Sequence, residues 1–341
     1  MNHLLLYVLL VPSFGLILEV LGASRTSPPS GSIVVNPSTT TSGQYKTLSS
    51  AIASLPDDSS SRSIFLYPGT YNEQVYIDQS GPVKIYGYTT DTSSYANNQV
   101  IIAHSASPAT ADSDDATGTL RVHSDNVALY NIDIRNDFGV TRTDGQAVAL
   151  SQYGSKFGAY ACRFLSYQDT LYANQGTQVY LESYIEGGVD FIFGRHGQAY
   201  FEGNTIASKG AGCITANGRQ SDDSGIYLFE KNTLVAASDA FSNVTGKVFL
   251  GRPWGDYAKV VFKNTVINTE LNKAIWSEWS SSNPMTDHIL FAEYQSTGPG
   301  VSGASRPSFA TILTQSEADQ YTIASTVGSD YSSWVDTSYL S

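Results

Sequence analysis

Short apolar segments recur along the middle of the chain, and each ends near a small or amide side chain. They contain the Val, Ile, Tyr and Phe residues that are typical of β-strands. The segments cover residues 128–134, 159–164, 179–185, 199–206, 226–234 and 260–266. When they are aligned on Asn131, Cys162, Ser183, Asn204, Asn232 and Asn264, successive spacings are 31, 21, 21, 28 and 32 residues. The shortest spacing recurs, and the longer ones have the length of that unit plus an inserted loop.

A unit of 21 residues that holds two or three short strands has the size of one coil of a parallel β-helix. A β-sandwich or a β-propeller is the alternative, but a propeller blade needs about 40 residues. The pattern therefore predicts an all-β solenoid whose coils stack about 4.8 Å apart. The amide side chains at equivalent places would then form a ladder from coil to coil.

The two ends of the chain have a different pattern. Residues Leu48 to Leu55 are apolar at helical spacing and are followed by Pro56. We expect a short helix that caps the open N-terminal end of the coil stack, because an uncovered end would expose core and strand edges. The tail from Ser305 onward, partly helical between Leu313 and Ala324, is expected to lie back along the body.

The N-terminus resembles an export signal. An apolar run from Leu4 to Leu18 is followed by small residues that offer a cleavage site near Ala23. A membrane anchor is the alternative, but the run is shorter than the roughly 20 residues that a membrane span needs. We therefore expect a secretion signal at 1–23, a Ser- and Pro-rich linker at 24–32, and one catalytic β-helix domain at 33–341 in a secreted, extracellular protein.

The amino-acid composition excludes some classes of binding partner. Only 15% of the 341 residues are charged, whereas long solvated helices are built from Glu, Lys and Arg, so the composition also favours strands. The formal net charge is −12. Nucleic acids and anionic membranes are bound by basic surfaces, so we expect neither as a partner.

Two cysteines, Cys162 and Cys213, are too few for a disulfide framework. We expect them to be unpaired and buried as small apolar residues. Asn243-Val244-Thr245 is the only glycosylation sequon, since Pro37 blocks the one at Asn36.

The most informative spacing runs from Gln146 to Asp190. Gln168 follows Gln146 by 22 residues, and Asp190 follows Asp169 by 21 residues. Residues one coil apart lie above one another, so these four side chains are expected on one face of successive coils. The two carboxylates would be roughly 5 Å apart, which is one strand spacing.

Two carboxyl groups at such a short distance oppose each other's ionisation, so one remains protonated while the other ionises. Such a pair can supply one nucleophile or base and one proton donor. Two neutral amides beside them can donate N–H groups to a developing oxyanion. These are the parts that acyl transfer requires.

Four blocks of the sequence resemble the signature blocks of pectin methylesterases and occur in the same order. They are Gln-Ala-Val-Ala-Leu at 146–150, Gln-Asp-Thr-Leu at 168–171, Asp-Phe-Ile-Phe-Gly at 190–194 and Leu-Gly-Arg-Pro-Trp at 250–254. Gly69-Thr70-Tyr71-Asn72-Glu73 resembles a further family segment, Gly-x-Tyr-x-Glu. The resemblance covers roughly residue 30 to the end and is closest to fungal members. It implies a right-handed parallel β-helix that hydrolyses methyl esters of polygalacturonate in the plant cell wall.

The resemblance also implies roles for the four residues of the spacing argument. Asp190 would be the nucleophile that attacks the ester carbonyl. Asp169 would first protonate the departing methanol and then activate water. Gln146 and Gln168 would stabilise the oxyanion.

The same family pattern implies substrate-binding residues. Arg252 would hold Asp190 ionised, since an adjacent cation lowers the pKa of a carboxylate. Trp254 would lie against a sugar ring, with Tyr172 and Phe193 as further aromatic walls. No cofactor and no metal are expected, the substrate is pectin, and a monomer is expected.

Other residues have plainer interpretations. Asp112, Asp114 and Asp115 lack the frame of a calcium loop, so we interpret them as a solvated loop. His196 follows Asp190 closely without metal spacing and is expected to be a satisfied surface side chain. Trp276 and Trp279 could line a cleft or pack under a loop, and the sequence does not decide between these two positions.

Two other functions remain open. Polygalacturonases and pectate lyases are also parallel β-helices that act on this polymer, and closely spaced carboxylates suit a retaining glycosidase. The paired glutamines and the Leu-Gly-Arg-Pro-Trp block have no clear part in glycoside cleavage, and a lyase needs a calcium cluster. A non-catalytic carbohydrate-binding β-helix would not need both aspartates.

Overall fold

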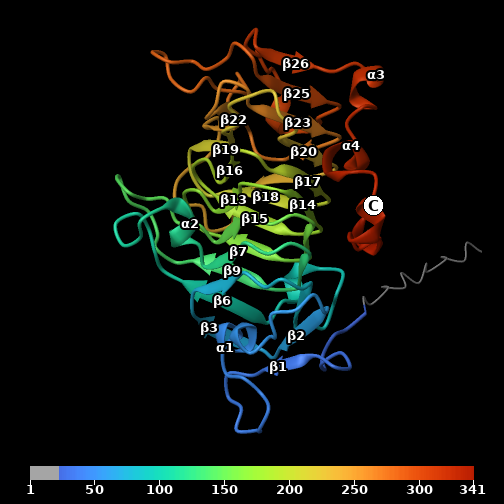
Figure 1. Cartoon of the computed structure of the whole chain (residues 1–341). Helices are drawn as coiled ribbons and strands as arrows, with labels where there is room; N and C mark the ends of the chain where they lie inside the picture. The colour runs from blue at the N-terminus through green and yellow to red at the C-terminus, as the bar shows by residue number, and fades with distance from the viewer. Residues whose placement is uncertain (1–22) are drawn as a thin grey trace, which may run out of the picture.

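A computed structural model describes residues 23–341, and its strands form three sheets that wind around one axis (Figure 1). The eleven-stranded sheet contains β1 (Ile33–Val35), β2 (Arg62–Leu66), β5 (Val83–Gly87), β8 (Val127–Tyr130), β11 (Phe157–Tyr160), β14 (Thr177–Leu181), β17 (Gln198–Glu202), β20 (Ile226–Glu230), β23 (Lys259–Lys263), β25 (Leu290–Tyr294) and β26 (Ala310–Ile312). The eight-stranded sheet contains β3 (Gly69–Asn72), β6 (Val100–His104), β9 (Asp133–Asn136), β12 (Arg163–Leu165), β15 (Tyr184–Gly187), β18 (Thr205–Ser208), β21 (Thr233–Ala236) and β24 (Val266–Ile267). The seven-stranded sheet contains β4 (Val75–Ile77), β7 (Leu120–Val122), β10 (Leu150–Gln152), β13 (Leu171–Ala173), β16 (Ile192–Gly194), β19 (Gly212–Asn217) and β22 (Val248–Pro253).

Every pair of neighbouring strands in these sheets is parallel. From β2 to β24 the chain visits the three sheets in turn, so each complete coil contributes one strand to each sheet, whereas β1, β25 and β26 extend the eleven-stranded sheet alone. Between β11 and β17 the partner of a residue lies 21 positions further along the chain, as in the pair Tyr160 and Leu181. The predicted right-handed parallel β-helix is confirmed.

The predicted ladder of polar side chains lies at the turn between the eleven-stranded and the eight-stranded sheets. The Oδ1 atom of Asn232 accepts hydrogen bonds from the backbone N and from Nδ2 of Asn204, both at 2.9 Å. Asn204 Oδ1 accepts from the backbone N of Ser183 at 2.9 Å, and Ser183 Oγ accepts from that of Cys162 at 3.0 Å. Each buried side chain thus satisfies a backbone N–H of the preceding coil, which is what a buried turn requires.

Two members of the sequence alignment are displaced by one residue. The pairs Tyr130–Tyr160 and Asp133–Arg163 place Asn131 opposite Ala161, not opposite Cys162. Asn264 likewise falls one position early, and both asparagines have positive φ values, 54° and 50°. Asn is favoured in this left-handed conformation as well as in the ladder, so its presence alone did not identify the equivalent position.

The inside of the stack is apolar and contains its own aromatic row. The rings of Tyr180, Phe201, Phe229 and Phe262 stack with centroids 4.8, 4.4 and 4.2 Å apart and with interplanar angles of 10° or less. These side chains come from β14, β17, β20 and β23, which are neighbours in one sheet. Stacked rings are favourable beyond the area that they bury, so this row reinforces the register of the coils.

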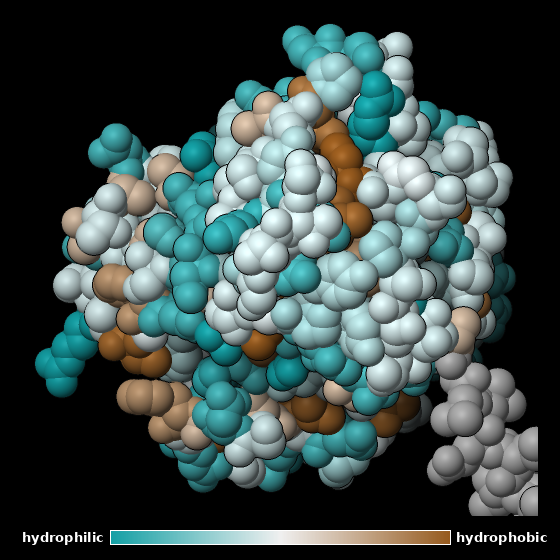
Figure 2. Space-filling model, turned by 90° about the horizontal axis from the view of Figure 1, so that it is seen from below, coloured by the Kyte–Doolittle hydropathy of each residue, from teal (hydrophilic) through white to brown (hydrophobic). Residues whose placement is uncertain are grey.

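The N-terminal helix is shorter than predicted. α1 (Leu48–Ala53) ends two residues before Leu55, buries Leu48 and Ile52, and contacts β1 and β4. Figure 2 views this end of the molecule, where the surface is mainly hydrophilic or intermediate and apolar atoms form only small strips. That α1 caps the stack stays a prediction.

The C-terminal tail lies back along the body, as predicted (Figure 1). It contains α3 (Gln315–Ala318) and α4 (Ile323–Val327), and α4 contacts β14 and β17 on the outside of the eleven-stranded sheet. The remaining helices are α2 (Asp114–Thr117) and four single turns, η1 (Tyr95–Asn97), η2 (Pro299–Val301), η3 (Tyr331–Ser333) and η4 (Thr337–Tyr339). Within residues 23–341, no helix has the length and apolar character that crossing a membrane requires. The predicted secretion signal falls outside the described residues, apart from Ala23.

Candidate active site

Two turns of successive coils carry the predicted carboxylates. The first turn runs from Gln168 to Thr170 between β12 and β13, and the second runs from Val189 to Phe191 between β15 and β16. We call them the acidic turns. Gln168 pairs with Gln146 on one side and with Val189 on the other, so the predicted stacking of the glutamines is confirmed.

Asp169 and Asp190 occupy equivalent places in the acidic turns. The pairs Gln168–Val189 and Leu171–Ile192 flank them with the same offset, which puts Asp169 directly beside Asp190 in the register. Both residues have a left-handed backbone, with φ values of 62° and 48°. Such values are uncommon outside Gly, although Asp tolerates them better than most residues, and they concentrate at functional sites.

Both carboxylates line one cavity of about 270 Å³ on the outside of the seven-stranded sheet. Its walls are Asp114, Gln146, Gln168, Asp169, Asp190, Phe193, Ala216, Arg252, Trp254 and Trp279. Seven of the eight predicted site residues are therefore brought together. The eighth, Tyr172, is not in the wall and is 93% buried behind it.

Arg252 holds one of the two carboxylates. Its Nε donates to Asp190 Oδ1 at 3.0 Å and its Nη2 donates to Asp190 Oδ2 at 2.6 Å, a bidentate pair. β16, β19 and β22 place Phe193, Ala216 and Arg252 opposite one another on three coils, which brings the guanidinium to the cavity. For Asp169 the structure gives no ion pair with a described residue.

The two carboxylates differ in electrostatics. Burial raises the pKa of Asp169 well above its usual range, and the charges of Asp190 and Asp114 raise it further against the opposing effect of Arg252. Burial also raises the pKa of Asp190, but the hydrogen bonds and the charge of Arg252 oppose that rise. The resemblance had implied that Arg252 lowers the pKa of Asp190. Arg252 does oppose the effect of burial, but the pKa of Asp190 stays above its ordinary value. Asp169 is the carboxyl group that keeps its proton to higher pH.

The two glutamines flank the carboxylates. Both side chains are half-buried and reach the cavity, and Gln146 Oε1 is buried with no hydrogen-bond partner among the described residues. Gly145 makes room for Gln168, because a Cβ there would come within 2.9 Å of Gln168 Oε1. The amides are therefore placed where they could donate to a group bound between them and the carboxylates.

An aromatic wall completes the cavity. The rings of Tyr172 and Phe193 stack at 4.3 Å and 4°, and Trp254 lies 6.1 Å from Phe193. The guanidinium of Arg195 lies over the Trp254 ring at 3.8 Å, and that of Arg252 lies over the Trp279 ring at 4.3 Å. Cations at these distances are attracted to an aromatic face, which fixes both tryptophans.

The solvated-loop interpretation of Asp114 and Asp115 is wrong. Ser113 caps α2 by accepting a hydrogen bond from the backbone N of Ala116, and both aspartates lie in the first turn of the helix. Asp114 lines the cavity, while Asp115 pairs with Arg121 at 2.5 Å. A Ser followed by two acidic residues is a helix-start signal, and it could have identified the helix.

The structure decides the ambiguous tryptophans, since Trp276 is buried in the core and Trp279 lines the cavity. His196 is a surface side chain whose Nδ1 lies 3.3 Å from a carboxylate oxygen of Asp223, as expected. Cys162 and Cys213 are free and buried, as expected.

Comparisons with known proteins identify the family of the chain. The Pectinesterase family model matches residues 32–330. A pectinesterase of Aspergillus niger is 44% identical over 94% of this chain and 95% of its own length, and one of Aspergillus aculeatus is 45% identical over 94% and 96%.

Solved structures give the same result. The crystal structure of the pectin methylesterase from Aspergillus niger, in deglycosylated form, superposes with a TM-score of 0.84 at 38% identity, covering 93% of this chain and all of that one. Pectin methylesterase from carrot superposes with a TM-score of 0.79 at 27% identity, covering 92% of this chain and 98% of that one. With the family model spanning nearly all of the described coils, the chain belongs to the pectinesterase family.

Proposed function

We propose that this protein hydrolyses the methyl esters of pectin to free carboxylates and methanol, using the cavity between the acidic turns. The observation that carries the proposal is the asymmetry of the stacked pair. Asp190 accepts two hydrogen bonds from Arg252, whereas Asp169 is buried beside two other carboxylates. One group is suited to act as an anion and the other as an acid.

Asp190 attacks the ester carbonyl carbon through a carboxylate oxygen, and the carbonyl oxygen becomes an oxyanion. N–H groups of Gln146 and Gln168 stabilise that charge. Asp169 gives its proton to the methoxy oxygen as the C–O bond breaks, so methanol leaves and an acyl-enzyme anhydride remains.

The second half of the reaction regenerates both side chains. The ionised Asp169 takes a proton from water, whose oxygen attacks the carbonyl carbon of the uronate. The bond to Asp190 then breaks, which frees the Asp190 carboxylate and the carboxyl group of the galacturonate, whose proton passes to solvent while Asp169 keeps the proton taken from water. Arg252 orients Asp190 for the attack, because its two hydrogen bonds hold both oxygens of the free carboxylate.

The substrate lies against the aromatic wall. The face of Trp254 matches the C–H face of a pyranose, and Phe193 adds an apolar side to the cavity. Tyr172 supports Phe193 from behind by stacking. Its role as a direct wall for the sugar stays a prediction.

The test measures three products from methylated pectin. We expect methanol release and acidification by the wild type, with no new reducing ends and no unsaturated products, and no methanol release by Asp190→Asn. New reducing ends without methanol would point to a glycosidase, and unsaturated products would point to a lyase. A strong chelator should leave the rate unchanged, and loss of activity that calcium restores would contradict the metal-free mechanism.

We also propose that the protein acts outside the cell as a monomer. The likeness to fungal pectinesterases supports the extracellular location. Residue Asn243 of the sequon is exposed, and glycosylation there stays a prediction. N-terminal sequencing of the protein from culture medium and its sedimentation velocity test the two statements.

A further inference from the structure

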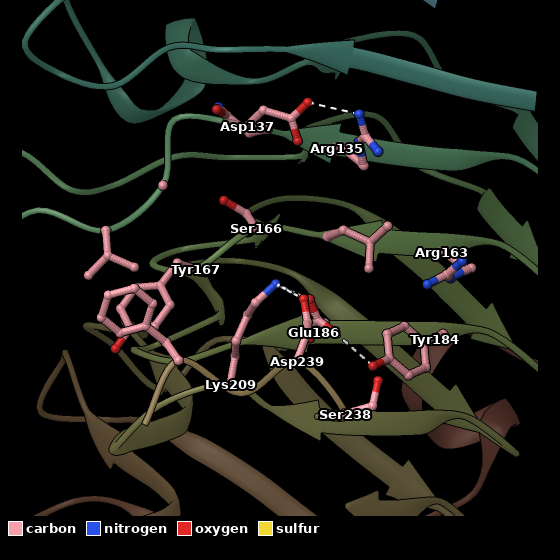
Figure 3. A pocket seen from close by; sticks show the side chains of 15 residues that line it. Arg135, Asp137, Arg163, Ser166, Tyr167, Tyr184, Glu186, Lys209, Ser238 and Asp239 are labelled. Carbon is pink, nitrogen blue, oxygen red and sulfur yellow. Dashed lines mark hydrogen bonds and ion pairs between the residues drawn. The ribbon is translucent and has the colours of Figure 1, made fainter. Parts of the chain in front are cut away.

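A second and larger cavity, of about 660 Å³, lies on the other side of the acidic turns (Figure 3). We call it the lateral cavity. Its floor is the outer face of the eight-stranded sheet at β9, β12 and β15, and its rim includes Val140 and Phe241. Neither the paired aspartates nor the two glutamines line it.

The lateral cavity and the acidic turns share the same coils. Ser166 and Tyr167 line the cavity and directly precede Gln168 and Asp169. Glu186, which also lines it, stands four residues before Asp190. A polymer that leaves the active site across these turns therefore meets the lateral cavity next.

The cavity gathers positive side chains from an acidic chain. Arg135, Arg163 and Lys209 all line it, together with three acidic side chains, Asp137, Glu186 and Asp239. The basic groups have acidic partners, of which Asp137 and Asp239 keep 50% and 62% of their side-chain surface exposed. Ion pairs with such exposed partners contribute little, so an incoming carboxylate can replace one of these partners at small cost.

Several donors in the cavity are unused. A guanidinium offers five N–H donors, yet Arg163 makes one side-chain hydrogen bond to the described residues, from Nη1 to Asp133 Oδ2 at 3.3 Å, besides lying over the Tyr184 ring. Ser166 is 92% buried, and its hydroxyl has no partner among the described residues. The amino group of Lys209, by contrast, is engaged by the carboxylates of Glu186 at 2.7 Å and Asp239 at 2.8 Å (Figure 3).

The rim supplies an apolar face. Phe241 is 68% exposed and Val140 is 39% exposed, and they are two of only five large apolar side chains exposed among residues 23–341. The Phe241 ring meets that of Tyr167 edge to face at 6.0 Å. An exposed ring at the rim and the free guanidinium donors of Arg163 in the same cavity match a sugar that carries both a C–H face and a carboxylate.

We propose that the lateral cavity is an accessory site that binds the free carboxylates and sugar rings of de-esterified pectin. The proposal rests on the proposed function, because only a pectin-hydrolysing enzyme generates that polymer beside these turns. Basic donors rather than the aspartates of the active site would hold the polymer there. Loss of this site should raise KM for partly de-esterified pectin more than it lowers kcat.

The test uses the double variant Phe241→Ala with Arg135→Gln. Phe241 is largely exposed, and Arg135 pairs with the exposed Asp137, so neither change should disturb the fold. The matched control combines Ile312→Ala with Arg62→Gln. Ile312 is 58% exposed, Arg62 pairs with the exposed Asp58, and neither lines the cavity.

Binding of unesterified polygalacturonate to the three proteins is measured by calorimetry, with polyglutamate as a second anionic polymer. The double variant should bind polygalacturonate about tenfold more weakly than the wild type and the control, since a few central side chains dominate binding. Equal Kd values in all three proteins would overturn the proposal. So would equal binding of polyglutamate, which would indicate attraction of any polyanion, or a changed sedimentation coefficient at equal Kd, which would make this face a contact between copies.

Methanol release from methylated pectin is measured on the same preparations. If the wild type releases methanol while the double variant binds polygalacturonate normally, only the accessory site is wrong. If the wild type releases no methanol, the proposed function itself is wrong.

Discussion

Two kinds of turn in the same coils stack their side chains in the same way but with opposite effects on stability. At the ladder turn, Ser183, Asn204 and Asn232 lie above one another, and each accepts a hydrogen bond from the coil before it. At the acidic turns, Asp169 and Asp190 lie beside each other in the same way, but two carboxylates cannot bond unless one is protonated. The ladder therefore stabilises the stack, while the acidic turns hold a group with a strongly raised pKa.

The difference shows what a coil repeat provides. Any side chain placed at a given turn has a neighbour of known position in the next coil, whatever its chemistry. Neutral amides in that position form hydrogen bonds with the neighbouring coil. Like charges in that position repel each other, and the rest of the fold holds them together. Functional sites commonly lower the stability of a protein in this way, because the arrangement that activity needs is not the most stable one.

The largest effect is expected from the carboxylates themselves. Asp190→Asn and Asp169→Asn keep the shape of the side chain but remove the nucleophile and the proton donor, so kcat should fall by at least about a thousandfold. Methanol release measures the rate, and circular dichroism checks the fold. A variant that keeps more than about a tenth of the wild-type rate would contradict the assigned role.

The two amides that flank the paired carboxylates should matter less. Gln146→Ala removes one donor to the oxyanion, and kcat should fall by about a hundredfold while KM changes little. The exposed Gln320→Ala serves as the control. A variant whose KM rises while kcat is unchanged would show that Gln146 binds the substrate instead.

The ladder should respond in stability and not in catalysis. Asn232→Ala leaves buried hydrogen-bonding groups of Asn204 unpaired, so the free energy of unfolding should fall by about 2 kcal/mol. Denaturant unfolding measures this change, and the exposed Asn268→Ala is the control. The rate per folded molecule should stay at the wild-type value, and a large drop in kcat would mean that the two turns are not independent.

At the acidic turns, in contrast to the ladder, a neutral substitution should raise the stability of the protein. Because burial raises the pKa of Asp169, the folded protein is favoured when this group is protonated, and that contribution is lost as the pH rises from about 3.9 through the folded-state pKa. Asp169→Asn should therefore unfold at a higher temperature than the wild type at pH 7. The difference should vanish at pH 3, and a variant that melts below the wild type at pH 7 would contradict this account.

The smallest expected effect concerns Asp114, the third carboxylate of the cavity. Its charge is one of the causes that raise the pKa of Asp169, so Asp114→Asn should lower that pKa. The alkaline limb of the profile of kcat against pH reports the loss of the Asp169 proton, and it should move down by up to about one pH unit. The profile of Asp112→Asn, an exposed neighbour, should not move. A shift to higher pH in Asp114→Asn would contradict the sign.

The sequence by itself determined the fold and the centre of the site. Its recurring 21-residue spacing equals the length of chain in one coil, and a fixed coil length makes register a local property. The positions of Gln146, Gln168, Asp169 and Asp190 therefore followed from counting. The family blocks added Arg252, Trp254 and Phe193, which the structure also places in the cavity.

Only the tertiary structure decided which loops close over that centre. Asp114 reaches the cavity from α2 and Trp279 from the segment between β24 and β25, and the path of such insertions is set by packing that no spacing encodes. The same limit applies to Tyr172, whose burial behind Phe193 depends on side-chain direction. It applies also to the pKa of Asp190, where burial and Arg252 act against each other and neither effect can be weighed before the cavity exists.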